Sequence, residues 1–242
     1  MTPRLYLPVS LRADDEFDLS TEQSHYVGRV LRLRPGDPLQ VFDGNGSRHA
    51  AIIVALQSKQ ARLRLGDALV PGAESPLSIT LAQCISSAEK MDWTIEKAVE
   101  LGVAAIQPLI SRRSIVRLDA QRAQRRSEHW QRLIVAACMQ CGRDRLPALA
   151  PTTDLSRWLA PPTPGVTALV LVPGGNVRLS RIEAPAARIR LLVGPESGLA
   201  DDEIEAARAA GFIEASLGPR VLRTETAGLA ALAVLQARAG DL

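Results

Sequence analysis

The feature that most constrains the fold is an alternation of short apolar runs with amphipathic segments from about residue 77 to the end of the chain. The apolar runs predict buried strands, and the segments between them carry the 3.6-residue periodicity of helices. Strands covered by helices on both faces imply a mostly parallel α/β sheet. The predicted strands are SITLAQCI (78–85), AAIQPLI (104–110), TALVLVP (167–173), IRLLVG (189–194) and EASLG (214–218). The predicted helices are SAEKMDWTIEKAVELG (87–102), QRRSEHWQRLIVAACMQCG (124–142), DDEIEAARAAG (201–211) and GLAALAVLQARAG (228–240).

The first part of the chain has a different pattern, with short apolar runs separated by turn signals such as RPGD, DGNG and LGD. VFDGNGSRHAAIIV predicts a hairpin that bends near Gly44 to Gly46. We therefore predict a small β-rich domain, a barrel, over residues 1–72. VPGAESP has the prolines and glycine of a linker, so the α/β domain is expected to span 73–242.

Composition excludes several classes of protein. The chain has 242 residues of which 46% are apolar, enough to bury a sizeable core. It has neither a run of roughly 18 apolar residues nor the apolar centre of a signal peptide, so we expect a soluble cytoplasmic protein with no membrane partner. Cys84, Cys138 and Cys141 are too few for a disulfide framework, and three scattered histidines show no metal-ligand spacing. No metal is expected.

Cationic residues are concentrated in one segment. Between Ser111 and Arg145 lie nine arginines against three acidic residues: Arg112, Arg113, Arg117, Arg122, Arg125, Arg126, Arg132, Arg143 and Arg145. Arginine forks match phosphate oxygens in pairs, so the segment is a candidate surface for a polyanion. A solvated helix face is the alternative interpretation.

Glycines gather after the later predicted strands, in LVPGG (171–175), LLVGPESG (191–198) and SLGPR (216–220). The first predicted strand is followed by CISSAEK rather than GxGxxG, which argues against a Rossmann cofactor site. Carboxyl ends of parallel strands are where such sheets bind ligands. Each loop alone is explained as a tight turn, but three together predict one cleft lined by main-chain groups.

LLVGPESGLADDEIEAARAAGF, followed by LGPRVLRTETAGLAAL, resembles the C-terminal signature of the RsmE family. HYVGRVLRLRPGDPLQVFDGNG, EKMDWTIEKAVELGV and SRRSIVR extend the resemblance over nearly the whole chain. The family consists of S-adenosylmethionine-dependent rRNA (uridine-N3)-methyltransferases of the SPOUT superfamily. The resemblance implies a trefoil-knotted parallel sheet with flanking helices, preceded by a PUA-like β-barrel.

The resemblance also implies a cofactor, partners and site residues. The cofactor is S-adenosylmethionine, the partner is 16S rRNA or the assembled small subunit, and the protein is a homodimer with residues of both chains in each site. Residues implied to bind the cofactor are Leu171, Pro173, Val193, Gly194, Pro195, Glu196, Gly198, Leu217, Gly218, Val221 and Leu222; Leu171, Val193, Leu217 and Leu222 would wall the adenine. Residues implied to face RNA are Arg4, Arg29, Arg32, Arg112, Arg113 and Arg117.

The final helix opens with Arg-Thr-Glu-Thr, which suits methylation of uracil N3. That nitrogen carries a proton at neutral pH, and its conjugate base spreads charge onto O2 and O4. A carboxylate can take the proton and an arginine can stabilise the charge, roles for which Glu225, Arg223 and Arg220 are candidates. Alternatively, Glu225 only orients Arg223 or the base, or it belongs to an acidic first turn capped by Thr224.

The chain departs from the family pattern at two positions of the segment GPESGLA (194–200). Ser197 replaces a glycine, which suggests that the backbone there needs no glycine-only conformation. Ala200 replaces a serine, and Asp201 is expected to take over the lost capping role. Three rival functions stay open: a SPOUT enzyme with another target such as ribose 2′-OH, a non-catalytic RNA-binding protein, and an enzyme acting on small nucleotides.

Overall fold

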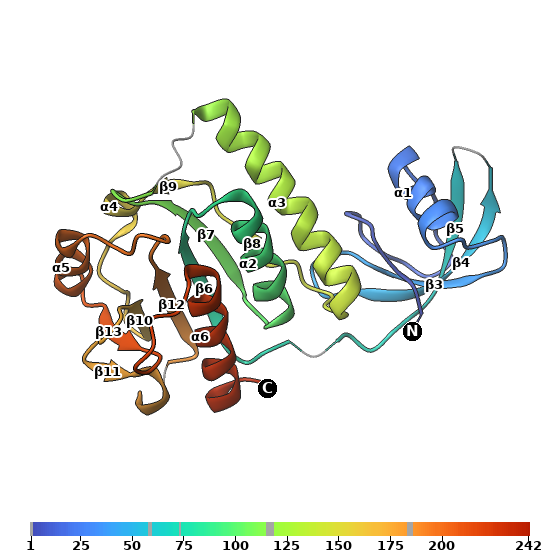
Figure 1. Cartoon of the computed structure of the whole chain (residues 1–242). Helices are drawn as coiled ribbons and strands as arrows, with labels where there is room; N and C mark the ends of the chain where they lie inside the picture. The colour runs from blue at the N-terminus through green and yellow to red at the C-terminus, as the bar shows by residue number, and fades with distance from the viewer. Residues whose placement is uncertain (1, 58–59, 73, 115–118, 183–185) are drawn as a thin grey trace. The chain divides into compact units, whose positions relative to one another are not determined.

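The computed structural model describes residues 2–57, 60–72, 74–114, 119–182 and 186–242 (Figure 1). The chain forms two compact units, one of residues 1–73 with 138–146 and one of 74–137 with 147–242. The first unit therefore adds the segment 138–146 to the predicted domain of 1–72. Each unit is built on its own sheet.

The first unit has a five-stranded sheet in the order β1-β3-β4-β5-β2. β1 runs parallel to β3, and the other neighbouring pairs are antiparallel. The predicted hairpin is confirmed: between β3 and β4, Asp43 Oδ1 accepts hydrogen bonds from the N–H groups of Asn45 (2.7 Å) and Ser47 (3.0 Å). The bounds are β1 Arg4–Tyr6, β2 Glu16–Asp18, α1 Thr21–His25, the π-helical turn η1 Tyr26–Val30, β3 Pro38–Phe42, β4 Arg48–Leu56 and β5 Ala61–Ala68.

The second unit has the predicted parallel sheet, in the order β11-β13-β10-β12-β6-β7-β8, with β9 also paired to β7. The predicted strands appear as β6 Ser78–Cys84, β7 Ala105–Ile110, β10 Val166–Leu171, β12 Arg188–Val193 and β13 Ile213–Ser216. The sequence analysis missed β8 Ala148–Leu149, β9 Thr153–Asp154 and β11 Val177–Arg178. Two residues are too few to show the alternation by which a strand is predicted.

The four predicted helices of this unit are present as α2 Ala88–Glu100, α3 Ala120–Cys141, α5 Asp201–Ala209 and α6 Thr224–Ala239. The short α4 Leu155–Trp158 and the 3-10 turn η2 Leu179–Arg181 were not predicted. α2 ends at Glu100, two residues before the predicted Gly102, whose φ of +76° is in the left-handed region that favours glycine. A glycine turn after a helix reverses the chain direction, and here it leads from α2 into β7.

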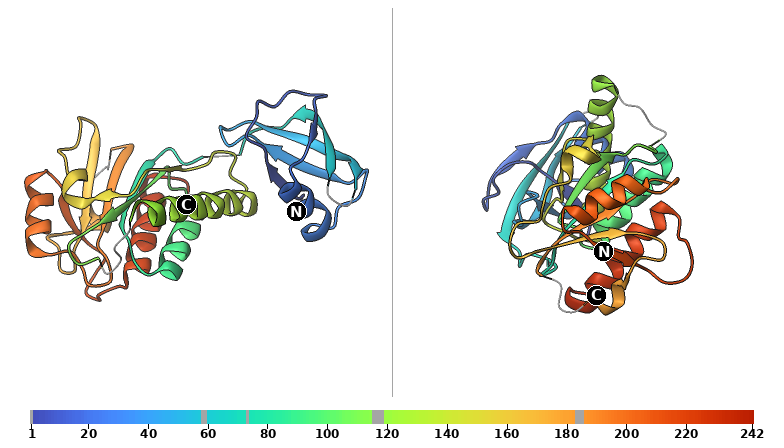
Figure 2. Two further views of the ribbon diagram at one scale, coloured as in Figure 1. Left: turned by 90° about the horizontal axis from the view of Figure 1, so that it is seen from above. Right: turned by 90° about the vertical axis from the view of Figure 1, so that its left-hand side faces the viewer.

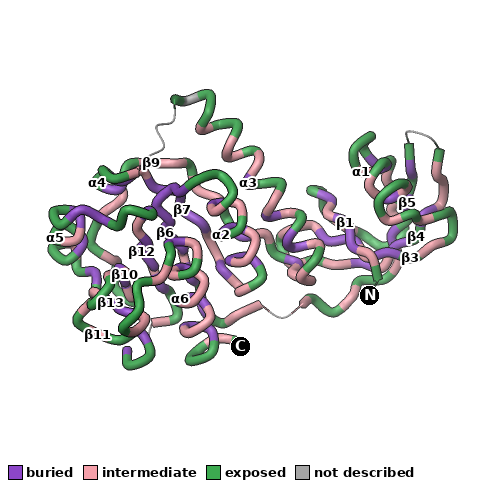
Figure 3. Tube along the Cα trace, viewed as in Figure 1, coloured by how far each residue is buried: buried purple, intermediate pink, exposed green. Residues whose placement is uncertain are grey.

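Helices cover both faces of the parallel sheet (Figure 2). On one face Ala82 and Leu192 pack in a cluster with Leu155 of α4 and Ala207 of α5. On the other face α6 packs against β6, β12 and α2. The central strands are accordingly buried (Figure 3), which explains their near-continuous apolar sequences.

Candidate cofactor pocket

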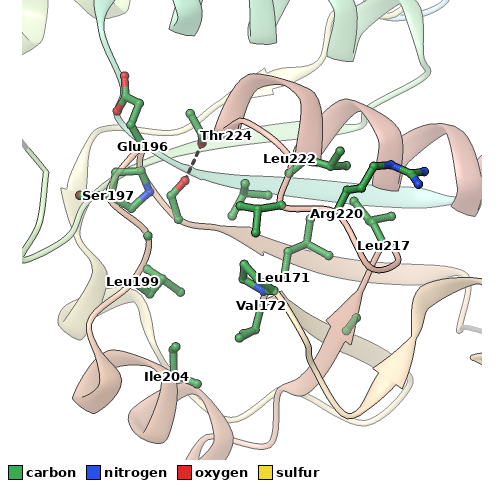
Figure 4. A pocket seen from close by; sticks show the side chains of 18 of the residues that line it. Leu171, Val172, Glu196, Ser197, Leu199, Ile204, Leu217, Arg220, Leu222 and Thr224 are labelled. Carbon is green, nitrogen blue, oxygen red and sulfur yellow. Dashed lines mark hydrogen bonds between the residues drawn. The ribbon is translucent and has the colours of Figure 1, made fainter.

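A pocket of about 300 Å³ lies at the carboxyl ends of β10, β12 and β13 (Figure 4). In the sheet register Leu171 pairs with Ala215 and Val170 pairs with Leu192, so these strands end at nearly the same level. The loops that follow them, together with the start of α6, form the walls. This is the cleft that the three glycine-containing loops predicted.

All eleven residues predicted to bind the cofactor line this pocket: Leu171, Pro173, Val193, Gly194, Pro195, Glu196, Gly198, Leu217, Gly218, Val221 and Leu222. The structure brings them together from three separate loops, while their binding of a cofactor stays a prediction. Arg220 also lines the pocket. Residues that the sequence analysis did not assign to the cofactor complete the lining: Val172, Ser197, Leu199, Ile204, Ala215, Thr224 and Ala227.

Gly194 is required by the close packing of the loop that follows β12. A Cβ at this position would lie 3.0 Å from the main-chain N of Leu199, closer than side chains normally come. Gly198 has a φ of +71°, whereas the φ of Ser197 is not positive. The prediction that Ser197 needs no glycine-only conformation is thus confirmed.

Thr224, the first residue of α6, ties this helix to the loop after β12. Its hydroxyl donates to the carbonyl oxygen of Gly194 (2.5 Å, dashed in Figure 4) and accepts a hydrogen bond from Gln83 Nε2 (2.9 Å). Thr224 and Gln83 are both buried. The expected role of Thr224 as a helix cap is wrong, because the N-cap is Arg223 and its side chain makes no capping bond.

The capping role expected for Asp201 is also wrong. α5 begins at Asp201, with Ala200 as the N-cap. The main-chain N–H of Ala200 donates to Glu203 Oε2 (2.8 Å), so a carboxylate three residues along satisfies this end of the helix. The buried Glu203 therefore makes the half of a capping box that needs no serine, in which the third helical residue accepts from the N-cap N–H.

Lys90 links the pocket rim to the first turn of α6. Its Nζ lies 3.4 Å from Glu196 Oε1 and 3.8 Å from Glu225 Oε2. Burial raises the pKa of the Glu196 carboxyl, but hydrogen bonds from the N–H of Ser87 and from its own N–H, together with the Lys90 ammonium, bring that pKa below its ordinary value. Glu196 is therefore an anion at neutral pH.

The three predicted catalytic residues occupy different surroundings. Arg220 and Arg223 are exposed. The side chain of Glu225 is 14% exposed, and its Oε2 is buried with no hydrogen-bond partner among the described residues. Arg220 lines the pocket, whereas Arg223 and Glu225 lie beside it, one residue either side of Thr224.

The predicted RNA-facing arginines divide into three groups. Arg29 and Arg32 are exposed on the first unit, and Arg112 and Arg113 are exposed on the second. Arg117 lies outside the described residues.

Arg4 corrects the prediction. Its side chain is only 5% exposed, and its Nη2 lies 2.7 Å from Oδ1 of the buried Asp144. The guanidinium also lies over the ring of Phe42, 4.8 Å from its centroid. Arg4 is therefore a buried structural cation of the first unit and cannot serve as an exposed RNA contact.

Lys97 and the cysteines lie outside the pocket lining. Lys97 forms an ion pair with Glu100, at 2.7 Å. The cysteines are free, and burial raises the pKa of the Cys84 thiol to about 12. Over the described ranges, no group of three or more His, Cys, Asp or Glu side chains is arranged to hold a metal ion. None of the helices in the described part of the chain is long and apolar enough to span a membrane.

Comparison with known protein families gives two matches. Residues 73–236 match a model described as an RNA methyltransferase domain, and residues 19–66 match an RNA methyltransferase PUA domain. Ribosomal RNA small subunit methyltransferase E of Buchnera aphidicola is 32% identical over 99% of this chain and 98% of its own length. The protein of the same name from Synechocystis is 35% identical over 90% of this chain and 72% of its own.

Solved structures show the same likeness. The ribosomal RNA small subunit methyltransferase E from Neisseria gonorrhoeae, bound to S-adenosylmethionine, has a TM-score of 0.95 and 41% identity over 100% of this chain and 99% of its own. A methyltransferase from Legionella pneumophila in complex with the same cofactor has a TM-score of 0.94 and 38% identity, with both chains covered completely. These matches confirm the predicted fold class, an α/β fold of the RsmE/SPOUT type with a parallel sheet, preceded by a PUA-like domain. The knot stays a prediction.

Proposed function

Because this chain belongs to the RsmE family of ribosomal RNA small subunit methyltransferases, we propose that it transfers a methyl group from S-adenosylmethionine to N3 of a uridine in 16S rRNA. The observation that carries the proposal is the pocket at the ends of β10, β12 and β13, where all eleven predicted cofactor residues converge.

The size and lining of the pocket support binding of S-adenosylmethionine. A volume of about 300 Å³ is at the lower end of the range for ligand sites. Leu171, Val193, Leu217 and Leu222 offer apolar surface to the adenine ring, and the main chain of the glycine loops offers N–H and C=O groups to the polar parts. The anionic Glu196 on the rim is an acceptor for hydroxyl or ammonium groups of the cofactor.

When bound, S-adenosylmethionine supplies the methyl group on its sulfonium. The residues of this chain must remove the N3 proton and stabilise the charge that develops on O2 and O4. We assign proton removal to Glu225, whose Oε2 accepts no hydrogen bond from the described residues and lies 3.8 Å from Lys90 Nζ. Arg223 and Arg220 are assigned to the developing negative charge because both are exposed cations beside the pocket.

The substrate RNA is proposed to contact both units. In the domain of residues 1–72 the proposed RNA contacts are the exposed Arg29 and Arg32. In the methyltransferase domain of 73–242 they are Arg112, Arg113 and Arg117. These arginines bind phosphate oxygens, which position the RNA without reading its sequence. We further propose that the protein is a homodimer of the cytoplasm whose partner is 16S rRNA or the assembled small subunit.

The experiment that tests the function is methyl transfer from labelled S-adenosylmethionine to unmethylated small subunits and, separately, to protein-free 16S rRNA. Nucleoside mass spectrometry then identifies the product. N3-methyluridine is expected, and the better substrate shows whether the subunit must be assembled. A 2′-O-methylated product would support the rival SPOUT enzyme, and RNA binding without transfer would support a binding protein.

A further inference from the structure

The loop that follows β12 depends on contacts with another segment for its conformation. Residues 194–200, called here the cofactor loop, contribute most of one pocket wall but lie outside helices and strands. Inside the loop, the N–H of Gly198 donates to the carbonyl oxygen of Pro195 (2.9 Å). One main-chain hydrogen bond does not determine the conformation of the whole loop, so contacts with other segments must stabilise the rest of it.

A second segment, residues 111–114 after β7, forms a closed turn and is called here the clamp loop. The main-chain N–H of Ser111 donates to Ser114 Oγ (3.0 Å), and that of Ser114 donates to the carbonyl oxygen of Ser111 (3.1 Å). The two hydroxyl groups are also 2.9 Å apart. The clamp loop is therefore held by its own side chains.

Reciprocal hydrogen bonds join the two loops. Ser197 Oγ donates to the carbonyl oxygen of Arg113 (2.9 Å). In return, Arg113 Nη1 donates to the carbonyl oxygens of Leu199 (3.0 Å) and, more weakly, Ser197 (3.5 Å). The serine that departs from the family pattern thus makes a bond that glycine cannot make.

Glu203 adds a third connection at the base of these loops. Its Oε1 accepts from the main-chain N–H of Arg112 and its Oε2 accepts from that of Ala200, both at 2.8 Å. The residue is only 8% exposed. A buried carboxylate shared by two main-chain donors fixes the separation of the clamp loop and the cofactor loop, because each charged hydrogen bond is strong and directional.

Arg113 is also suited to a second ligand. Its described bonds to the cofactor loop are made by Nη1, whereas a guanidinium has five N–H donors. The residue is exposed, so its remaining donors can reach a phosphate without breaking the bonds to Leu199 and Ser197. A phosphate held in this way would restrict the Arg113 side chain further in the conformation that supports the pocket wall.

We propose that Ser197 and Arg113 are positioning residues for the cofactor loop, and that Arg113 couples the binding of an RNA phosphate to the binding of S-adenosylmethionine. The coupling rests on the proposed function, whereas the positioning of the loop does not. By thermodynamic reciprocity, RNA raises the affinity for the cofactor by the same factor by which the cofactor raises the affinity for RNA.

The first arm of the test uses no RNA. Isothermal titration calorimetry measures the Kd for S-adenosylmethionine in the wild type, Ser197→Ala and Arg113→Ala. Losing one neutral hydrogen bond weakens binding about fivefold and losing a charged one weakens it more, so the Kd should rise about 5-fold in Ser197→Ala and about 10-fold in Arg113→Ala. Ser156→Ala and Arg157→Ala are matched controls because both residues are exposed on α4, and they should leave the Kd unchanged. An unchanged Kd in both Ser197→Ala and Arg113→Ala overturns the proposed positioning.

The second arm repeats the titration with saturating protein-free 16S rRNA at one fixed salt concentration. RNA should tighten cofactor binding about 5-fold in the wild type, a coupling of usual size. Arg113→Lys keeps the charge but lacks the fork that can hold carbonyl and phosphate together, so it should lose this gain. If RNA leaves the wild-type Kd unchanged while the enzyme still methylates RNA, the coupling is overturned and the proposed function stands. If no RNA is methylated, the proposed function fails, and the first arm still decides the positioning.

The kinetic readout separates positioning from general damage to the fold. At saturating cofactor, Ser197→Ala should recover a kcat within about twofold of the wild type, while its KM for S-adenosylmethionine rises with the Kd. Loss of kcat with an unchanged KM would contradict the assignment, because a positioning residue of the cofactor loop acts on cofactor affinity.

Discussion

Replacing Thr224 by valine removes one hydroxyl from the junction between α6 and the cofactor loop while keeping the shape of the side chain. The hydroxyl donates to the carbonyl oxygen of Gly194 at 2.5 Å and accepts from Gln83 Nε2 at 2.9 Å. Gln83 Nε2 retains its bond to the carbonyl oxygen of Cys84, at 3.0 Å. The carbonyl oxygen of Gly194 loses its short bond and keeps only the long one from Gln83 Nε2, at 3.5 Å.

The expected cost follows from these contacts. A buried polar group left without a partner costs about 1–3 kcal/mol, and Thr224 is only 6% exposed. With the acceptor left only a long bond and the donor partly satisfied, Thr224→Val should lower the free energy of unfolding by about 1–3 kcal/mol. Thr224→Ser keeps the hydroxyl and loses a methyl group, which costs about 1 kcal/mol.

Urea unfolding followed by tryptophan fluorescence measures this difference. The three tryptophans, Trp93, Trp130 and Trp158, all belong to the second unit, so their signal reports the unit that contains the pocket. Thr226→Val is the matched control because Thr226 is exposed in the same turn, and its effect should stay within about 0.5 kcal/mol. If Thr224→Val costs no more than Thr224→Ser, the hydroxyl does not hold the two segments together.

Three further predictions concern charged residues. Arg4→Ala should destabilise the first unit by about 3 kcal/mol because it leaves the buried carboxylate of Asp144 without its nearest cation, and amide hydrogen exchange in β3 and β4 should accelerate. The lowered pKa of Glu196 means that its stabilising contribution is present above pH 4.5 and is lost as the pH falls through the lowered value. The stability difference between wild type and Glu196→Gln should therefore shrink from about pH 6 to pH 3, and a constant difference would contradict the sign. Replacing Arg29 and Arg32 together by alanine should weaken RNA binding and reduce the salt slope by about one for each lost phosphate contact, as measured by filter binding. An unchanged slope would exclude both as phosphate ligands.

The sequence predicted most of the sheet and the pocket because their signals are local. Buried parallel strands are near-continuous apolar runs, and the loops that form a ligand site in such a sheet follow the strands directly in the chain. The glycines of LVPGG, LLVGPESG and SLGPR therefore predicted that the three loops line one cleft. The knot had no local signal and entered only through the resemblance to the RsmE family.

The residues that were mispredicted or missed depend on partners far away in the chain. Arg4 was assigned to RNA as an isolated cation, but its partner Asp144 lies 140 residues further on. Thr224 was expected to cap its own helix, whereas its hydroxyl is bonded to Gly194, 30 residues earlier, and to Gln83, 141 residues earlier. Periodicity and spacing carry no information about such pairs, because only the tertiary fold brings them together.

The central claim is that the pocket binds the cofactor and that the adjoining Arg-Thr-Glu-Thr turn acts on the uracil. Single-turnover methyl transfer at saturating S-adenosylmethionine, measured for the wild type, Arg223→Ala and Glu225→Gln, tests it most directly. The prediction is a loss of rate of about 100-fold or more in each variant, with the Kd for the cofactor unchanged. Rates within a few-fold of the wild type in both variants would contradict the claim and place the chemistry elsewhere.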